Sequence, residues 1–195
     1  VSLDTRINDN NSLTFATIWQ MQYTSTGPAG ASAGYIKYGG VPELYIGWNY
    51  KSGNYLSRIG IDYLSIKPYK NDPGRSSTLS YFMYDEYLGT NWNFKNKLTY
   101  ANDGSHFNMI GGYGLSGNVI DGFEYSATNN VSDWFSVQYK GGNLRPELFL
   151  GYIKMFGTDE EIIGDFWGKN SAGSINQMYR IQPEIVYNLG KVAFG

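Results

Sequence analysis

Hydrophobic and polar residues alternate with a period of two along several segments of this chain. Residues 92–100 show the pattern well, because apolar and polar side chains occupy alternate positions there. The apolar set is Trp92, Phe94, Leu98 and Tyr100, and the polar set is Asn93, Lys95, Lys97 and Thr99. Successive side chains of a β-strand point to opposite faces, so the pattern predicts a strand with one apolar face and one charged face.

The same alternation predicts ten strands, of which the first and the last are incomplete. They span residues 1–7, 12–24, 43–51, 55–67, 78–88, 91–101, 133–140, 144–156, 178–188 and 192–195. Short Gly- and Asn-rich turns at 8–11, 51–54, 89–91, 141–143 and 189–191 alternate with long connections at 25–42, 68–77, 102–132 and 157–177. Up-and-down strands with tight turns at one rim and long loops at the other give this order, which is typical of outer-membrane barrels.

Residues 106–116 could also pass for a strand. Counting them as one would move the turn at 141–143 to the wrong rim, so 102–132 is predicted as one long external loop. Part of this loop can be extended, and part can fold into the pore.

These features together predict an all-β, transmembrane, up-and-down antiparallel β-barrel that forms a single domain over residues 1–195. The first and last strands are too short to cross an apolar band of about 25 Å, and open strand edges are unfavourable in lipid. We therefore expect the chain to be part of a larger barrel, truncated at both ends. The alternative is a complete ten-stranded barrel with short terminal strands.

Composition narrows the class of protein further. The 195 residues carry a net charge of −2, which gives no electrostatic case for nucleic acid, and they include no cysteine, which excludes disulfides and thiol chemistry. No apolar window reaches the roughly 18 residues of a spanning helix. A mean hydropathy of −0.38 is compatible with a membrane barrel, because half of each strand faces away from lipid.

Charged residues of both signs lie opposite the apolar positions, where a barrel would place them in its water-filled interior. There they would create a field that filters solutes by charge. The predicted pore-lining residues are Glu43, Arg58, Asp62, Lys95, Lys97, Lys140, Arg145, Glu147, Arg180 and Glu184. In a narrow, closed barrel the same charges would instead form structural salt bridges.

Aromatic residues gather near the predicted tight turns. The predicted membrane-interface aromatics are Tyr50, Tyr55, Trp92, Tyr139 and Tyr187. Their similar distance from the turns favours an interfacial girdle over the ordinary preference of tyrosine for strands.

Three local features complicate the pattern. Pro146 and Pro183 fall inside strands, where each requires a bulge or an unpaired site, because proline donates no backbone hydrogen bond. In strand 78–88, Phe82 and Tyr84 share a face with Glu86, which indicates a bulge or a subunit contact.

Signals of catalysis are weak. His106 is the one histidine and is expected to be a solvated loop residue, and the acidic run at 159–161 is interpreted as a solvated face rather than a calcium site. No enzyme activity, metal or cofactor is predicted. An outer-membrane enzyme is disfavoured because Asp62 and Asp85 have no histidine within a strand to work with them.

Several segments resemble porins of the DcaP-like family, as found in the outer membranes of Bacteroidota. They are residues 1–3, 13–22, 24–30, 39–44, 63–68, 109–116 and 150–157, so the resemblance extends over the chain. It implies a homotrimer of roughly sixteen-stranded diffusion channels for small, often anionic solutes, of which this chain would be the carboxyl-side part. The family carries no catalytic residues, and its chains normally end on an aromatic assembly signal, which Gly195 does not match.

The favoured function is therefore a passive porin of the bacterial outer membrane that contacts lipid and small solutes but no nucleic acid. The alternative is a structural or partner-binding barrel whose loops at 102–132 and 157–177 dock a surface lipoprotein or a secretion component. A soluble β-sandwich lectin is a further alternative, and it would be extracted without detergent.

Overall fold

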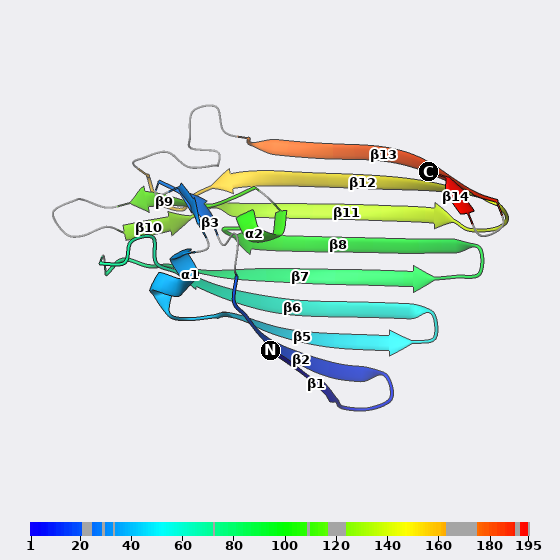
Figure 1. The fold of residues 1–195 in the computed structure, drawn as a ribbon, viewed down its shortest axis with the longest axis horizontal. Coiled ribbons are helices and arrows are strands. Elements are labelled where there is room, and N and C mark those ends of the chain that lie inside the picture. Colours follow the sequence, from blue (N-terminus) through cyan, green and yellow to red (C-terminus); the bar gives the residue numbers. More distant parts are fainter. Residues whose placement is uncertain are drawn as a thin grey trace.

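One large antiparallel sheet dominates the structure (Figure 1). The computed structural model describes residues 1–20, 25–28, 30–32, 34–71, 73–108, 110–116, 124–162, 175–189 and 192–194. The strand order is β1-β2-β5-β6-β7-β8-β11-β12-β13-β14, so chain neighbours pair throughout. The all-β class is thus confirmed, and as far as the described residues extend, no pairing joins β1 to β14.

The strands of this sheet lie close to the expected segments. They are β1 (Ser2–Arg6), β2 (Asn11–Ile18), β5 (Glu43–Ser52), β6 (Tyr55–Ile66), β7 (Ser76–Leu88), β8 (Trp92–Asn102), β11 (Asn129–Tyr139), β12 (Leu144–Gly157), β13 (Gln177–Leu189) and β14 (Val192–Phe194). The tight turns gather at one end of the sheet and the long connections at the other, on the right and left of Figure 1. The predicted alternation of short and long connections is confirmed.

The long connections form small elements of their own. A hairpin joins β3 (Ser25–Gly27) to β4 (Gly30–Ser32), and a second one joins β9 (Tyr113–Ser116) to β10 (Glu124–Ala127). The helices are α1 (Gly34–Gly39) and α2 (Ser105–Asn108). Residues 113–116 pair only within their own hairpin, so leaving 106–116 out of the main sheet was correct. No helix among the described residues is long and apolar enough to cross a membrane.

Two strand boundaries were wrong. β2 ends at Ile18 rather than at 24, and residues 21–24 lie outside the described part of the chain. β11 begins at Asn129 rather than at 133, because residues 129–132 continue the ladder with β8. These residues show no apolar alternation, so tertiary pairing sets the boundary there rather than local pattern.

The two strand prolines are accommodated without a bulge. Pro146 pairs with Ile185 and Pro183 with Leu148 in an uninterrupted register between β12 and β13. The ladder of β12 with β11 stops at Glu147, and that of β13 with β14 begins at Tyr187. Each proline therefore has a ladder on one side only, which is the unpaired site that its missing N–H requires.

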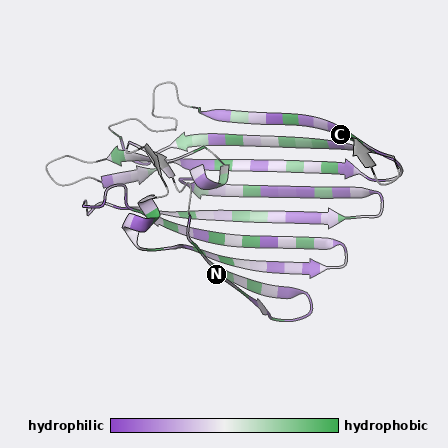
Figure 2. Cartoon of the chain, viewed as in Figure 1, coloured by the Kyte–Doolittle hydropathy of each residue, from purple (hydrophilic) through white to green (hydrophobic). Residues whose placement is uncertain are grey.

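The two faces of the sheet differ in chemistry. Residues directly opposite in an antiparallel pair share a face. Arg58 on β6 pairs with Tyr84 on β7, and Tyr84 pairs with Lys97 on β8. We call the face that carries these three residues the polar face. The face with Ile46, Ile61 and Tyr81 is the apolar face. Hydrophilic and hydrophobic residues alternate along the long strands (Figure 2).

The buried core lies at the long-loop end, where α1 and β9 pack against the sheet. Its main cluster comprises Tyr35, Ile36, Leu64, Ile66 and Tyr113, with Tyr125 packed against it. Leu64 and Ile66 alternate in phase with Arg58, so the long connections cover the polar face at this end.

Candidate functional site

A row of basic and aromatic residues crosses the middle of the polar face. Pairing from strand to strand aligns Arg58, Tyr84, Lys97, Trp134, Gly151 and Arg180 at one level. No ion pair of Arg58, Lys97 or Arg180 is found within the described ranges of the chain. A hollow of about 440 Å³ lies over Arg58, Tyr84, Lys97 and Trp134. We call the six aligned residues, Arg58, Tyr84, Lys97, Trp134, Gly151 and Arg180, the basic row.

Aromatic rings lie beside two cations of the basic row, Lys97 and Arg180. Lys97 Nζ lies 5.5 Å from the centroid of the Phe82 ring, and the Arg180 guanidinium lies 5.7 Å from the Phe149 ring. Phe82 in turn stacks on Tyr45, with 5.4 Å between ring centroids. Cations over aromatic faces are attracted by the ring quadrupole, so these charges are positioned without a carboxylate partner.

Glycines make room for the stacked rings. Gly47 and Gly60 are directly paired between β5 and β6. A Cβ atom at Gly60 would lie 2.5 Å from Phe82 and 2.6 Å from Tyr45. The rings of Phe82 and Tyr45 thus lie over the backbone of the glycines. Phe82 can therefore occupy the same polar face as Tyr84 and Glu86, because it packs against this backbone and against Tyr45. The register of β7 is continuous, so no bulge is involved.

The acidic residues nearer the tight turns are engaged by neighbours. Glu86 lies 3.3 Å from Lys95 Nζ. Ser136 and Gln138 donate hydrogen bonds of 2.8 and 2.9 Å to the two carboxylate oxygens of Glu147. Glu184 pairs directly with Glu147 across β12 and β13 and accepts a long contact of 3.5 Å from Gln182.

The remaining predicted site residues at this end are Lys140 and Arg145. Arg145 alternates in phase with Glu147 and so lies on the polar face, whereas Lys140 follows the end of β11. Within strands, all predicted pore-lining residues are therefore on the polar face.

Glu43 and Asp62 lie on the polar face too, but they are buried at the long-loop end. Their exposed fractions are 1% and 3%. The expectation that they line open water is wrong in the described structure, because α2 covers them. The alternation predicts which face a side chain takes, but not what a distant loop places over it.

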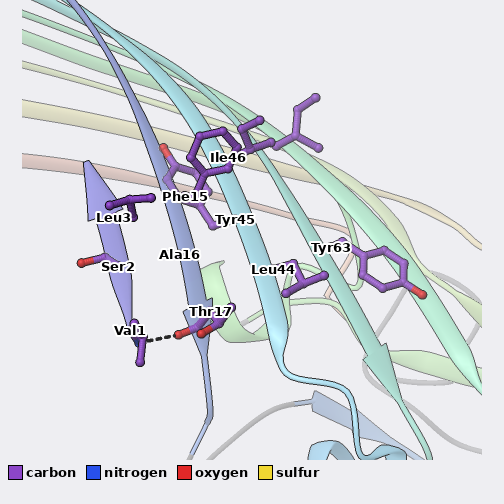
Figure 3. Close-up of a pocket in the computed structure, with 11 residues that line it drawn as sticks. Val1, Ser2, Leu3, Phe15, Ala16, Thr17, Leu44, Tyr45, Ile46 and Tyr63 are labelled. Carbon is purple, nitrogen blue, oxygen red and sulfur yellow. Dashed lines mark hydrogen bonds between the residues drawn. The ribbon is translucent and has the colours of Figure 1, made fainter. Parts of the chain in front are cut away.

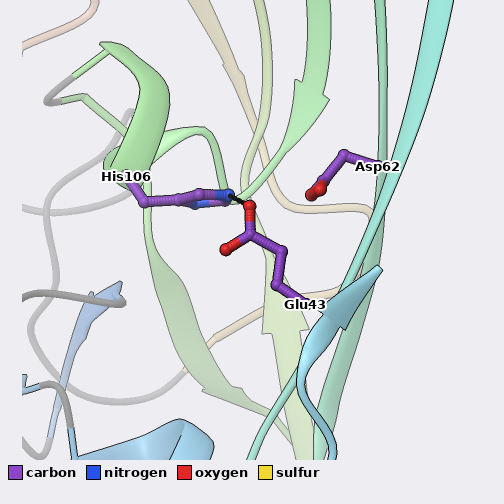
Figure 4. Close-up of side chains that lie close together, drawn as sticks. All are labelled: Glu43, Asp62 and His106. Atoms are coloured by element: carbon purple, nitrogen blue, oxygen red, sulfur yellow. Dashed lines mark ion pairs between the residues drawn. The ribbon is translucent and has the colours of Figure 1, made fainter. Parts of the chain in front are cut away.

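His106 is the residue that covers them. Its side chain is 2% exposed, and its Nε2 atom lies 3.7 Å from Glu43 Oε1. One donor atom each of His106, Glu43 and Asp62 lies within 4.8 Å of the others. Figure 4 shows the imidazole pointing at the Glu43 carboxylate, with Asp62 beside it. The expectation of a solvated loop histidine is therefore wrong.

Asp103 fixes the start of α2. It is fully buried, with a positive φ of 51°, and accepts hydrogen bonds from the hydroxyls of Ser105 and Ser25. Its N–H donates to the Thr128 carbonyl. Burial raises the pKa of the Asp103 carboxyl above its ordinary value, and His106 and the two serine hydrogen bonds act in the opposite direction.

The apolar face exposes large hydrophobic side chains over most strands of the sheet. Leu44, Ile46, Ile59, Ile61, Leu98, Leu148, Leu150 and Ile181 are among those that are more than a third exposed. Beside β1 this face is hollowed into a groove of about 460 Å³ that is lined by Leu3, Phe15, Leu44 and Ile46 among others (Figure 3).

The five expected interface aromatics lie on the apolar face, each beside a tight turn. Trp92 pairs with Tyr139, with ring centroids 5.0 Å apart, and Tyr50 lies 6.3 Å from Tyr55. Tyr187 is 45% exposed near the end of β13. The five residues therefore share one face and one end of the sheet, and the interfacial girdle stays a prediction.

A small polar patch interrupts the apolar face. Asp85 pairs with Asn96, and Asn96 donates a hydrogen bond of 2.7 Å to Asp133 on the next strand. The Tyr55 hydroxyl donates a hydrogen bond of 2.6 Å to Asp85. We call Asp85, Asn96 and Asp133 the outer polar patch. The sequence interpretation of strand 78–88 concerned Phe82, Tyr84 and Glu86 on the polar face, and it did not predict this patch on the apolar face.

The His106 cluster was also missed, although a signal existed. Glu43 and Asp62 are the acidic residues nearest the long-loop ends of their strands, and 102–132 was expected to be able to fold inward. Combining these two points with the one histidine of that loop would have suggested the contact. Comparisons of the chain with protein-family models, curated proteins and solved structures found no match.

Proposed function

We propose that this chain forms part of a transmembrane β-barrel of the bacterial outer membrane. The observation that carries the proposal is the contrast between the faces, since a ladder of large apolar side chains backs a charged face. Monomeric soluble proteins rarely expose contiguous apolar patches of more than a few hundred Å². Full burial of a large apolar side chain gains roughly 1.5 to 3 kcal/mol, so covering the exposed part of each of these side chains with lipid contributes a fraction of that gain, summed over the whole face.

We further propose that the barrel is a porin, a passive diffusion channel for small hydrophilic solutes. The polar face would line its lumen, and the long connections over Leu64 and Ile66 would narrow it at one end. The aromatics beside the tight turns match the girdle that outer-membrane barrels carry at the membrane interface.

The channel prefers anions in this proposal. Arg58, Lys97 and Arg180 make no ion pair among the residues described, whereas Glu86 is paired with Lys95 and Glu147 is hydrogen-bonded to Ser136 and Gln138. Uncompensated positive charge in a confined aqueous space raises the local concentration of anions. The balance in the central hollow is therefore positive despite the net charge of the chain.

The outer polar patch favours a contact between barrels. A charged side chain on a lipid face destabilises a barrel most strongly at the bilayer midplane. Packing against a neighbouring copy would take Asp85, Asn96 and Asp133 away from acyl chains. This supports the homotrimer that the resemblance to DcaP-like porins implies.

Planar-bilayer recording on the full-length protein tests the proposal. We expect stable single-channel conductance and a reversal potential that indicates anion preference in a salt gradient. Absence of conductance across several salts, together with a stoichiometric partner that copurifies in detergent, would contradict the porin and favour a docking barrel instead.

A further inference from the structure

His106, Glu43 and Asp62 converge from three separate elements. His106 lies on α2, Glu43 begins β5, and Asp62 lies on β6 (Figure 4). Their side chains offer one imidazole and two carboxylates with donor atoms within 4.8 Å of one another. This is a borderline donor set of one nitrogen with oxygens, which suits Zn²⁺ and neighbouring divalent transition metals.

Several polar atoms of the cluster lack a hydrogen-bond partner. They are Asp62 Oδ2 and both ring nitrogens of His106, and each is shielded from solvent. Buried polar atoms are nearly always satisfied, and two carboxylates near each other in a low dielectric repel when no cation lies between them. The acceptors among these atoms, which are Asp62 Oδ2 and the ring nitrogen of His106 that carries no hydrogen, therefore point to a positively charged ligand.

A supporting contact orients one of the carboxylates. Gln20 Nε2 donates a hydrogen bond of 2.8 Å to Glu43 Oε2, whereas Glu43 Oε1 is the atom that faces His106. Such an outer hydrogen bond fixes a ligating carboxylate and leaves its second oxygen for the metal. The His106 ring also lies close to the ring of the adjacent Phe107, with ring centroids 3.9 Å apart.

We propose that Glu43, Asp62 and His106 form a buried site for a divalent transition-metal cation, with Zn²⁺ as the best fit. Two carboxylates and a neutral imidazole neutralise the charge of such a cation. Ligand atoms around tetrahedral Zn²⁺ lie about 3.4 Å apart, given Zn–ligand distances of about 2.1 Å. The 3.7 Å between His106 and Glu43 needs a small contraction, and the separations to Asp62, which lie within 4.8 Å, allow for a larger one.

A metal at this site would link the connection between β8 and β11 to the polar face of the sheet. α2 belongs to the connection between β8 and β11, whereas Glu43 lies on β5 and Asp62 on β6, which β7 separates from β8 in the strand order. A bound cation would join these parts and hold α2 over the polar face. This inference goes beyond the proposed channel and stands or falls independently of conductance.

Metal binding to the full-length, chelator-treated protein in detergent tests the site. We expect one Zn²⁺ per chain by isothermal titration calorimetry, and one Co²⁺ that gives a visible d–d absorption band. His106→Ala and Asp62→Asn should each weaken Zn²⁺ binding by at least about 100-fold. Glu147→Gln is the matched control, because this polar-face carboxylate contacts serine and glutamine but no histidine, and it should bind Zn²⁺ as the wild type does.

Circular dichroism distinguishes loss of the site from loss of the fold in these variants. If the wild type binds neither ion stoichiometrically, the proposal is wrong. Binding that survives His106→Ala in a folded protein would equally overturn it. A preference for Ca²⁺ over Zn²⁺ would also contradict the proposal, because it would indicate an all-oxygen site that excludes the imidazole.

Discussion

Lys97 Nζ lies 5.5 Å from the centroid of the Phe82 ring, on the adjacent strand of the polar face. A ring face thus supplies the partner that a carboxylate supplies to Lys95 at the next level. Lys95 and Lys97 are two residues apart and lie on the same face of β8, so the sequence does not distinguish them. Within the described part of the chain, only Lys95 has a carboxylate partner, and the charge of Lys97 stays uncompensated. This difference underlies the proposed selectivity for anions.

Reversing the charge of Lys97 should reduce anion selectivity. Lys97→Glu is expected to lower the anion-to-cation permeability ratio by about fivefold, the factor that corresponds to about 1 kcal/mol of charge interaction in a wet environment. Reversal potentials in a salt gradient measure the change. Lys70→Glu, which alters an exposed lysine outside the strands, is the control and should leave the ratio unchanged. Equal effects of both variants would remove Lys97 from the conduction path.

Adding a side chain at Gly60 should destabilise the sheet. The Cβ of Gly60→Ala would lie 2.5 Å from Phe82 and force the stacked rings to move, at a cost of about 1 to 3 kcal/mol. Urea unfolding in lipid vesicles measures the loss. Gly151→Ala is the control, because its Cβ would meet Phe149 at 3.1 Å and needs a smaller shift. If the two variants lose the same stability, ring packing over Gly60 does not constrain the fold.

Removing charge from the outer polar patch should weaken self-association. Asp133→Leu makes the apolar face more compatible with lipid, so a buried polar contact between copies would be lost while the single barrel stays folded. Native mass spectrometry in detergent should show a shift from trimer toward monomer. Lys154→Leu changes a polar residue nearer the long-loop end and should retain the trimer. An unaltered trimer in Asp133→Leu would exclude the patch from the subunit contact.

Asp103 should make stability fall as pH rises. Its folded pKa is raised above the value of about 3.9 for an unfolded chain, so the folded state holds the proton more tightly. The stabilisation is complete below about pH 4 and is lost as pH rises toward the folded pKa, with His106 the facing titratable group. Asp103→Asn lacks this proton, so the gap in urea midpoint between wild type and variant should change with pH. A constant gap from pH 4 to 8 would refute this role.

The strands could be predicted from the sequence because each is long and strictly alternating. Residues such as Phe94 and Lys95 report their faces locally, since period two is a property of the strand alone. Asn129 and Asn130 could not be assigned this way, because only their pairing with β8 makes them strand residues.

The chemistry near the long loops could not be predicted from alternation. Glu43 and Arg58 look equivalent in the sequence, yet one is buried under α2 and the other is exposed. Burial there depends on contacts between distant segments, such as Ser25 with Asp103 and Glu43 with His106. Such contacts leave no periodic signal in the chain.

The central claim is that the two faces of the sheet meet different solvents, and spin-label accessibility tests it most directly. The chain has no cysteine, so single cysteines at positions 94, 95, 97 and 98 of β8 can be labelled one at a time in lipid vesicles. We predict that labels at 94 and 98 collide mainly with oxygen, which concentrates in lipid, and labels at 95 and 97 with a water-soluble nickel chelate. Equal exposure of all four labels to the nickel chelate would contradict the account.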